Sequence, residues 1–220
     1  MERNVDLLEI SDGKRYKASD LVKVYCNECK GCSECCRGMG DSIKLDPFDI
    51  HMLCKATGKN FSELMNGLIE LNVADGVIIP NIKMQDENDA CSFLDINGRC
   101  SVHELRPGFC RLFPLGRVYE DDGFDYFLQI NECHYSEKSK IKIKKWLGIA
   151  ELSAYEKYVT DYHSIYKSLG DKLIKAQDEN LSQKLNVIFL NSFFVLPYDI
   201  ERDFYEQYYD RSVEFRKEYL

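Results

Sequence analysis

The chemistry that this sequence could support lies in its cysteines, of which there are ten in 220 residues. Five of them crowd the run CNECKGCSECC, and four more follow after a gap. The crowded run contains three successive C-x-x-C steps, a spacing that lets a loop fold around one centre with its thiolates pointing inward. Such clusters in a reducing compartment usually bind a metal or carry out redox chemistry. The two groups are Cys26, Cys29, Cys32, Cys35 and Cys36, and then Cys91, Cys100, Cys110 and Cys133.

The spacing of the first group favours iron over zinc. Zinc takes four thiolates in tetrahedral geometry, whereas a cubane cluster takes one thiolate for each iron. The steps Cys29, Cys32 and Cys35 supply three ligands as the bacterial ferredoxin run does, although Cys36 is followed by Arg37 and not by proline. No second C-x-x-C pair follows, as it would in a zinc ribbon. We therefore expect an iron–sulfur cluster, of the 4Fe-4S type, with zinc as the alternative.

The number of centres stays open at this point. Adjacent residues normally project in different directions, so Cys35 and Cys36 are not equivalent ligands of one compact site. Either a single cluster is completed by cysteines from the second group, or two centres share the first group. Four downstream cysteines are enough for either arrangement.

Other polar residues near the cysteines have simpler interpretations. Cys54 falls on the apolar face of an expected helix, and we interpret it as a small buried hydrophobe. His103 and His134 could substitute in a mixed site, but a local hydrogen-bonding role is the simpler prediction. The guanidinium groups of Arg106 and Arg111 flank Cys110, where they could donate to cluster sulfides and raise the potential, or could form surface ion pairs.

Composition limits the classes of partner. A net charge of -8 argues against general affinity for nucleic acid or anionic membranes, since both are bound through their phosphates. The lysine-rich stretch 138–145 beside Trp146 is in this context a solvated face. The start MERNVDLLEI lacks the pattern of a secretory signal, and no run of apolar residues is long enough for a membrane span. We expect a cytoplasmic protein, with an unknown protein as partner or substrate.

The gap between the two cysteine groups predicts two short helices. Asp46 and Pro47 form a cap and first-turn pair for a helix that stops near Gly58. Ser62 can cap a second helix that carries the apolar residues of 64–69. Each helix is too short to form a core alone.

Extended structure is expected on either side of the second cysteine group. Residues 77–84 look extended, with Pro80 arguing against a central strand. The pair Asn97-Gly98 favours a type I′ hairpin turn, which would bring Cys91 and Cys100 face to face. Alternating apolar residues over 124–130, after the turn residues Asp121-Asp122-Gly123, predict another strand.

The cysteine-free part of the chain is expected to be helical. Apolar residues recur at helical spacing from Leu147 to Gly170, where the glycine suits a helix end. Two more helices follow over about 179–195 and 199–218, with Asp199 as a cap. We therefore expect an α+β, mainly helical fold. Its cysteine-rich loops and small hairpins surround the metal in residues 1–135, and a helical extension, 136–220, packs on them.

The cysteine pattern also resembles a known family. Cys29-x-x-Cys32-x-x-Cys35-Cys36, followed by CSFLDINGRCSVHELRPGFCRLFPLG, is similar to the CxxCxxCC cysteine-cluster family, often called YkgJ-like and described as zinc- or iron-chelating proteins. The resemblance covers residues 26–135. It implies that Cys29, Cys32, Cys35, Cys36, Cys91, Cys100 and Cys110 are ligand candidates, with Cys133 and Cys26 as additional ones.

The same signature occurs in flagellin lysine N-methylases of the FliB type, in which the cysteines are thought to hold an iron–sulfur centre used with S-adenosylmethionine. Three functions follow as hypotheses. The first is an iron–sulfur protein with a redox or enzyme-component role. The second is an S-adenosylmethionine-dependent enzyme that resembles these methylases. The third is a structural zinc module that presents its helices to a protein partner. No acid, base or nucleophile stands out, so the sequence leaves enzymatic activity undecided.

Overall fold

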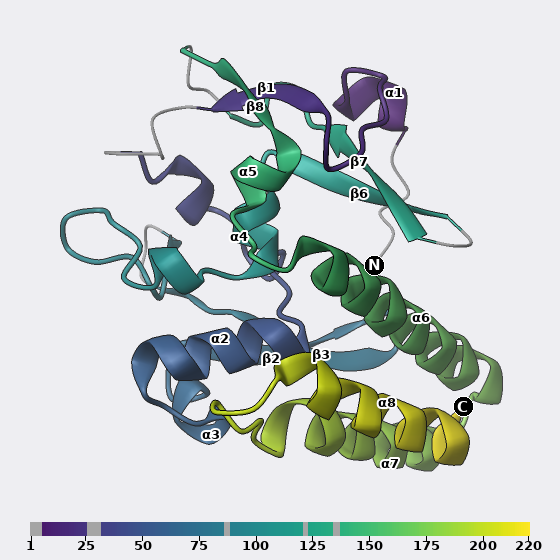
Figure 1. The fold of residues 1–220 in the computed structure, drawn as a ribbon. Helices are drawn as coiled ribbons and strands as arrows, with labels where there is room; N and C mark the ends of the chain where they lie inside the picture. Colours follow the sequence, from purple (N-terminus) through teal and green to yellow (C-terminus); the bar gives the residue numbers. More distant parts are fainter. Residues whose placement is uncertain (1–5, 26–31, 86–88, 121–122, 134–136) are drawn as a thin grey trace.

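The computed structural model describes residues 6–25, 32–85, 89–120, 123–133 and 137–220 (Figure 1). Helices outnumber strands by residue, so the fold is α+β and mainly helical, as the sequence predicts. Within the described residues, four antiparallel two-stranded sheets are spread along the first two thirds of the chain. Their pairs are β1 (Leu21–Tyr25) with β8 (Ser139–Lys142), β2 (Ile69–Ala74) with β3 (Val77–Ile82), β4 (Met84–Gln85) with β5 (Ala90–Cys91), and β6 (Leu115–Glu120) with β7 (Gly123–Leu128).

The helices form two groups. The short ones lie among the hairpins, and the long ones follow from residue 152 onward. The short helices are α1 (Leu7–Ile10), α2 (Pro47–Thr57), α3 (Phe61–Leu64), α4 (Gly108–Leu112) and α5 (Ile143–Leu147). The long ones are α6 (Leu152–Ala176), α7 (Glu179–Leu190), which continues as a π-helix over Asn191–Val195, and α8 (Phe204–Tyr219).

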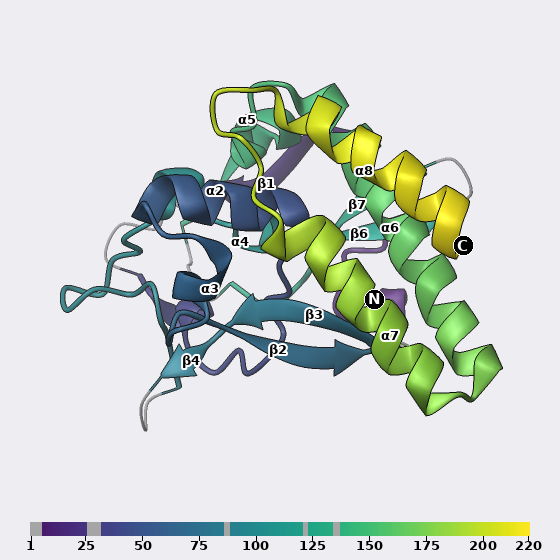
Figure 2. The ribbon, with the colours of Figure 1, turned by 90° about the horizontal axis from the view of Figure 1, so that it is seen from below.

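Helices α6 and α7 pack on the β2–β3 hairpin and on each other, and α8 packs on α6 and on the π-helix, as the view from below shows (Figure 2). One hydrophobic core joins this helical layer to the hairpins, and it contains residues as distant in sequence as Phe93 and Phe189. A smaller core lies under the β1–β8 pair and includes Val22, Tyr126 and Leu147. None of the helices in the described part of the chain has the length and apolar character needed to span a membrane.

Helix α2 forms where the sequence predicts it. The Asp46 side chain accepts a hydrogen bond from the backbone of Asp49, and Asp49 accepts one from the backbone of Asp46. This reciprocal capping box satisfies amides that would otherwise have no partner in the first turn. Gly58 ends the helix at φ +69°, a left-handed conformation that glycine adopts at little cost.

The expected second helix is shorter than predicted and has a different cap. Asn60, not Ser62, accepts the capping hydrogen bond from the backbone of Glu63, and the helix ends at Leu64. Gly67, at φ +100°, redirects the chain, so that Ile69 begins a strand and not another helical turn. Strand pairing with β3 thus prevailed over the helical spacing of the apolar residues. The extended prediction for 77–84 is confirmed by β3 and β4.

The chain reverses at Asn97-Gly98, but the prediction that Cys91 and Cys100 face each other was wrong. Only Gly98 of the pair has a positive φ, whereas a type I′ turn requires it at both residues. Cys100 pairs with Leu94 by an isolated bridge, while Cys91 pairs with Met84 of β4. The expected strand after Gly123 is present as β7, although it ends at Leu128.

Two helix boundaries in the C-terminal part also differ from the expectation. Gly170 does not end α6, which continues to Ala176. The glycine instead lies inside the helix, where it packs against the loop that joins β2 to β3. A Cβ atom at Gly170 would come within 2.8 Å of the carbonyl oxygen of Asp75. The last helix is capped by Asp203, whose side chain accepts from the backbone of Glu206, and not by Asp199.

Candidate metal centre

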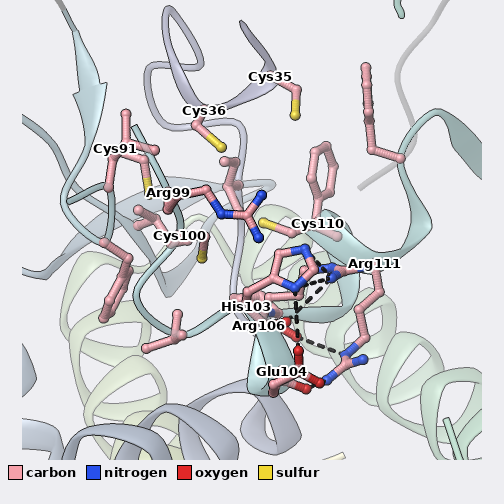
Figure 3. Close-up of a pocket in the computed structure, with 18 of the residues that line it drawn as sticks. Cys35, Cys36, Cys91, Arg99, Cys100, His103, Glu104, Arg106, Cys110 and Arg111 are labelled. Atoms are coloured by element: carbon pink, nitrogen blue, oxygen red, sulfur yellow. Dashed lines mark hydrogen bonds and ion pairs between the residues drawn. The ribbon is translucent and has the colours of Figure 1, made fainter. Parts of the chain in front are cut away.

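Cysteines from both groups line a single cavity of about 630 Å³. They come from three stretches of chain, namely the segment after β1, the segment around β5, and helix α4. Figure 3 shows sulfur atoms from all three stretches facing the space between them. The cysteines that line the cavity are Cys32, Cys35, Cys36, Cys91, Cys100 and Cys110.

The first stretch is fixed to the second by backbone pairing. Cys35 and Cys36 lie on a short 3-10 helix, Glu34–Cys36. Directly after it, Arg37 forms an isolated antiparallel bridge with Ala90, and the Gly38 nitrogen donates to the Asp89 carbonyl at 2.9 Å. Because Ala90 precedes Cys91 in β5, this bridge holds the two groups of cysteines side by side.

The second stretch is a small folded loop. After Cys91, the chain turns through Gly98 and returns to pair Cys100 with Leu94. The Ser101 nitrogen donates to the Phe93 carbonyl at 2.8 Å, and the Ser101 hydroxyl donates to the same carbonyl at 3.0 Å. Phe93 is buried in the main core and anchors this loop.

The third stretch presents Cys110 from α4. The helix begins after Pro107, and its first residue, Gly108, donates its backbone hydrogen to Asp49 Oδ1 at 2.7 Å. Asp49 is only 3 % exposed, so this contact connects the buried start of α4 to the buried start of α2. The position of Cys110 therefore depends on a carboxylate that is far away in the sequence.

The thiols of the described residues are free of disulfides. Burial raises the pKa of Cys91, Cys100 and Cys110, and neighbouring thiols raise all three further. The hydrogen bond to Cys36, followed by burial, raises the pKa of Cys35. Without a metal these four thiols are therefore held protonated. A metal that binds as thiolate must displace those protons, which makes its affinity depend on pH.

Cationic side chains lie beside the thiols in the lining of the cavity. Arg99 extends into the space that the sulfur atoms face, and together with Arg106 it favours the thiolate form of Cys100 (Figure 3). Arg106 contacts the His103 Nε2 atom at 2.7 Å. Arg111 donates to the carbonyls of Glu104, Arg106 and Leu147, so it braces the loop before α4. Lys145 also lines the cavity.

Some predicted candidates are not in this cavity. Cys133 is described but does not line it, and Cys54 lies on α2, half-buried against the main core. Cys26, Cys29 and His134 fall outside the described residues. Sequence reasoning missed Asp49 and Arg99. For Asp49, the capping-box pattern with Asp46 was the available signal, but nothing in the sequence indicated its contact with α4.

The thiols of the cavity surround a space and do not converge on one point. Within the described ranges, no group of three or more His, Cys, Asp or Glu side chains could hold a single metal ion. The donor set nevertheless fits a soft metal, because six thiols line one cavity and thiolates select zinc and iron–sulfur clusters.

Comparison with known proteins agrees with this donor set. The model of the CxxCxxCC family, described as a putative zinc- or iron-chelating domain, matches residues 28–147, more than half of the 220-residue chain. No curated protein and no solved structure gave a significant match, so the expected similarity to the lysine methylases has no support there. The match contains both groups of cavity cysteines. The chain therefore belongs to the CxxCxxCC family.

Proposed function

We propose that this cavity binds one iron–sulfur cluster of the 4Fe-4S type, which serves electron transfer or acts as the redox component of an enzyme. The observation that carries the proposal is that six cysteines from three stretches of chain line one cavity. A small cluster of this kind takes four cysteine thiolates, one for each iron. The cavity thus offers enough thiols for one cluster.

The wide arrangement of the thiols favours a cluster over a zinc ion. Four thiolates around one zinc at about 2.3 Å place their sulfur atoms roughly 3.8 Å apart. Cluster ligands stand farther apart, because each binds a different iron. Among the described residues, the thiols share a cavity without forming a single-ion group, which matches the second arrangement better.

We assign the four ligands to Cys35, Cys91, Cys100 and Cys110. In addition to burial, Cys35, Cys91 and Cys100 raise the pKa of Cys110, Cys35 and Cys100 raise that of Cys91, and Cys35 raises that of Cys100, so the thiolate forms of these four residues would all influence one another. Arg99 and Arg106 supply positive charge beside a ligand set that becomes negative on binding. Such cations raise the reduction potential of a cluster. Bound there, the cluster supplies one-electron chemistry, while the chain fixes its charge environment and its exposure to water.

The test is the metal and sulfide content of protein purified without oxygen. We expect brown protein with about four iron and four acid-labile sulfide per chain, and visible absorption that bleaches with dithionite. Colourless protein with stoichiometric zinc and no sulfide would contradict the proposal. That result would move the assignment to a structural zinc module, in which a chelator unfolds the cysteine-bearing part without any redox signal.

A further inference from the structure

A second cavity, of about 790 Å³, lies on the other side of α4 from the cysteines. Phe109 and Phe113 line both cavities, so the two spaces share a wall. Apolar side chains form much of the second cavity, among them Leu45, Ile79, Leu115, Phe127 and Val159. Its volume lies in the range of sites for small organic ligands.

Within the described ranges, two side chains with a positive charge line this second cavity, namely Arg117 on β6 and Lys44, which is paired with Asp41. The Nη2 atom of Arg117 donates to the Tyr155 hydroxyl at 3.2 Å, and its guanidinium carbon lies 5.1 Å from the centre of the Phe124 ring. Its Nε is buried and has no hydrogen-bond partner among the described residues. Burial lowers the pKa of Arg117, but the nearby hydroxyls of Tyr155 and Tyr119 more than compensate, so the guanidinium stays charged.

Four described carboxylate side chains also line the cavity, namely Asp41, Asp46, Asp49 and Glu132. Asp41 forms an ion pair with Lys44. Burial raises the pKa of Asp46 and of Asp49, against the opposing effect of the Arg117 charge, so both carboxyl groups are biased toward the neutral form. Asp49 accepts from the backbone nitrogens of Gly108 and Asp46, and Asp46 accepts from that of Asp49. Across the part of the chain that the structure describes, the ion pairs do not include Arg117. The guanidinium is therefore a half-buried cation that contacts a tyrosine hydroxyl and ring faces and is attracted by Asp46 and Asp49, while its Nε donor has no hydrogen-bond partner among the described residues.

A donor atom that is buried without a hydrogen-bond partner is costly, and the Nε of Arg117 is such a donor among the described residues. The planar fork of arginine matches a carboxylate, which can accept from two of its nitrogens at once. Apolar walls around that fork would accept the hydrocarbon part of the same molecule. We propose that this cavity binds a small organic carboxylate with an apolar body, its carboxylate held by Arg117. This inference is independent of which metal the cysteines bind.

Benzoate is a suitable probe, with benzamide as its uncharged counterpart of the same shape. We expect saturable binding of benzoate to the metal-loaded 220-residue protein in isothermal titration calorimetry. Benzamide should bind at least about tenfold more weakly, because the charge-assisted hydrogen bonds are lost. The Arg117→Met variant should bind benzoate more weakly than the wild-type protein by a similar factor. The affinity of Arg117→Lys for benzoate should lie between those of the wild-type protein and Arg117→Met. The matched control is Arg216→Met, which removes an arginine paired with Asp161; neither residue lines the cavity, and the variant should bind benzoate normally.

Three outcomes would overturn the proposal. Equal affinity of the wild-type protein for benzoate and benzamide would show that Arg117 does not select a carboxylate. Saturable binding of inorganic phosphate without any binding of benzoate would show that the cavity takes a different anion. If neither benzoate nor inorganic phosphate bound at millimolar concentration, Arg117 would be a structural cation only. The wild-type comparison decides the matter even if Arg117→Met fails to fold.

Discussion

Asp49 Oδ1 accepts a hydrogen bond of 2.7 Å from the backbone nitrogen of Gly108, and this contact joins the start of α2 to the helix that carries Cys110. The other oxygen of Asp49 accepts from the Asp46 nitrogen at 3.1 Å. One buried carboxylate thus satisfies amides at two helix starts that are distant in the sequence. The geometry of the cysteine cavity depends in this way on a residue that does not line it.

The first prediction concerns this carboxylate. Asp49→Ala should lower the free energy of unfolding by roughly 2–3 kcal/mol, because two amides in the interior lose a carboxylate acceptor. It should also lower the metal content of the purified protein, because α4 loses the partner of its first amide. Urea denaturation and metal analysis check the two effects.

Asn60→Ala is the matched control for Asp49→Ala. It removes an exposed capping box at the start of α3, away from the cavity, and should cost about 1 kcal/mol without changing the metal content. If both variants retained the same metal content, the proposed coupling between α2 and Cys110 would be wrong.

The second prediction uses the close approach of Gly108 to Tyr155. A Cβ atom at Gly108 would clash with the Tyr155 hydroxyl oxygen but would lie 3.5 Å from the ring carbon that bears it. Gly108→Ala should therefore destabilise the protein by roughly 1–3 kcal/mol through overpacking. The double variant with Tyr155→Phe should recover most of that loss, because only the oxygen clashes. A double-mutant cycle measures this coupling, and additive effects would contradict it.

The third prediction concerns Gly170, which packs against a backbone carbonyl group and not against a flexible side chain. The Asp75 carbonyl lies where the new Cβ atom of Gly170→Ala would be, so α6 must move away from the β2–β3 hairpin. We expect a loss of roughly 1–3 kcal/mol, although alanine favours helix. Ser168→Ala, at an exposed position of the same helix, should instead be neutral or slightly stabilising. A stabilised Gly170→Ala variant would show that the glycine is not required for packing.

The fourth prediction is a pH dependence of stability at His51. Burial, and then the charge of Lys55, lower the pKa of His51 in the folded protein. The unfolded state therefore binds more protons once the pH falls below about 6.5. The contribution of the neutral histidine is fully present above that pH and is lost as the pH falls through the lowered pKa. Compared with the wild-type protein, His51→Gln should lose less stability between about pH 7 and 5. Parallel slopes in guanidinium denaturation would contradict this.

Local features of the fold could be predicted from the sequence, because nearby residues determine them. Asp46, Pro47 and Gly58 bound α2 through their own side chains and backbone preferences. Gly170 was misinterpreted because its role depends on Asp75, which only the tertiary structure brings close. The Asn97-Gly98 prediction found the reversal but not the pairing, since β4 competes for Cys91.

The same distinction applies to the candidate metal centre. Residue type and spacing were enough to nominate the cysteines, and six of them line one cavity. Their arrangement depends on the bridge between Arg37 and Ala90 and on the contact between Asp49 and Gly108, which join segments far apart in the sequence. No periodicity or motif signals such contacts. For the same reason, Arg117 did not stand out until the fold placed it among the tyrosines.

The last prediction tests the ligand assignment by removing one thiol at a time. Four single variants replace one proposed ligand each by serine, at Cys35, Cys91, Cys100 or Cys110. Each variant should contain less iron and show weaker visible absorption after anaerobic purification, because each thiolate holds a different iron. Cys54→Ser is the matched control, since it changes a half-buried cysteine on α2 that does not line the cavity. Its iron content should equal that of the wild-type protein. If Cys32→Ser or Cys36→Ser removed the iron while Cys35→Ser retained it, the ligand from the first group would have to be reassigned.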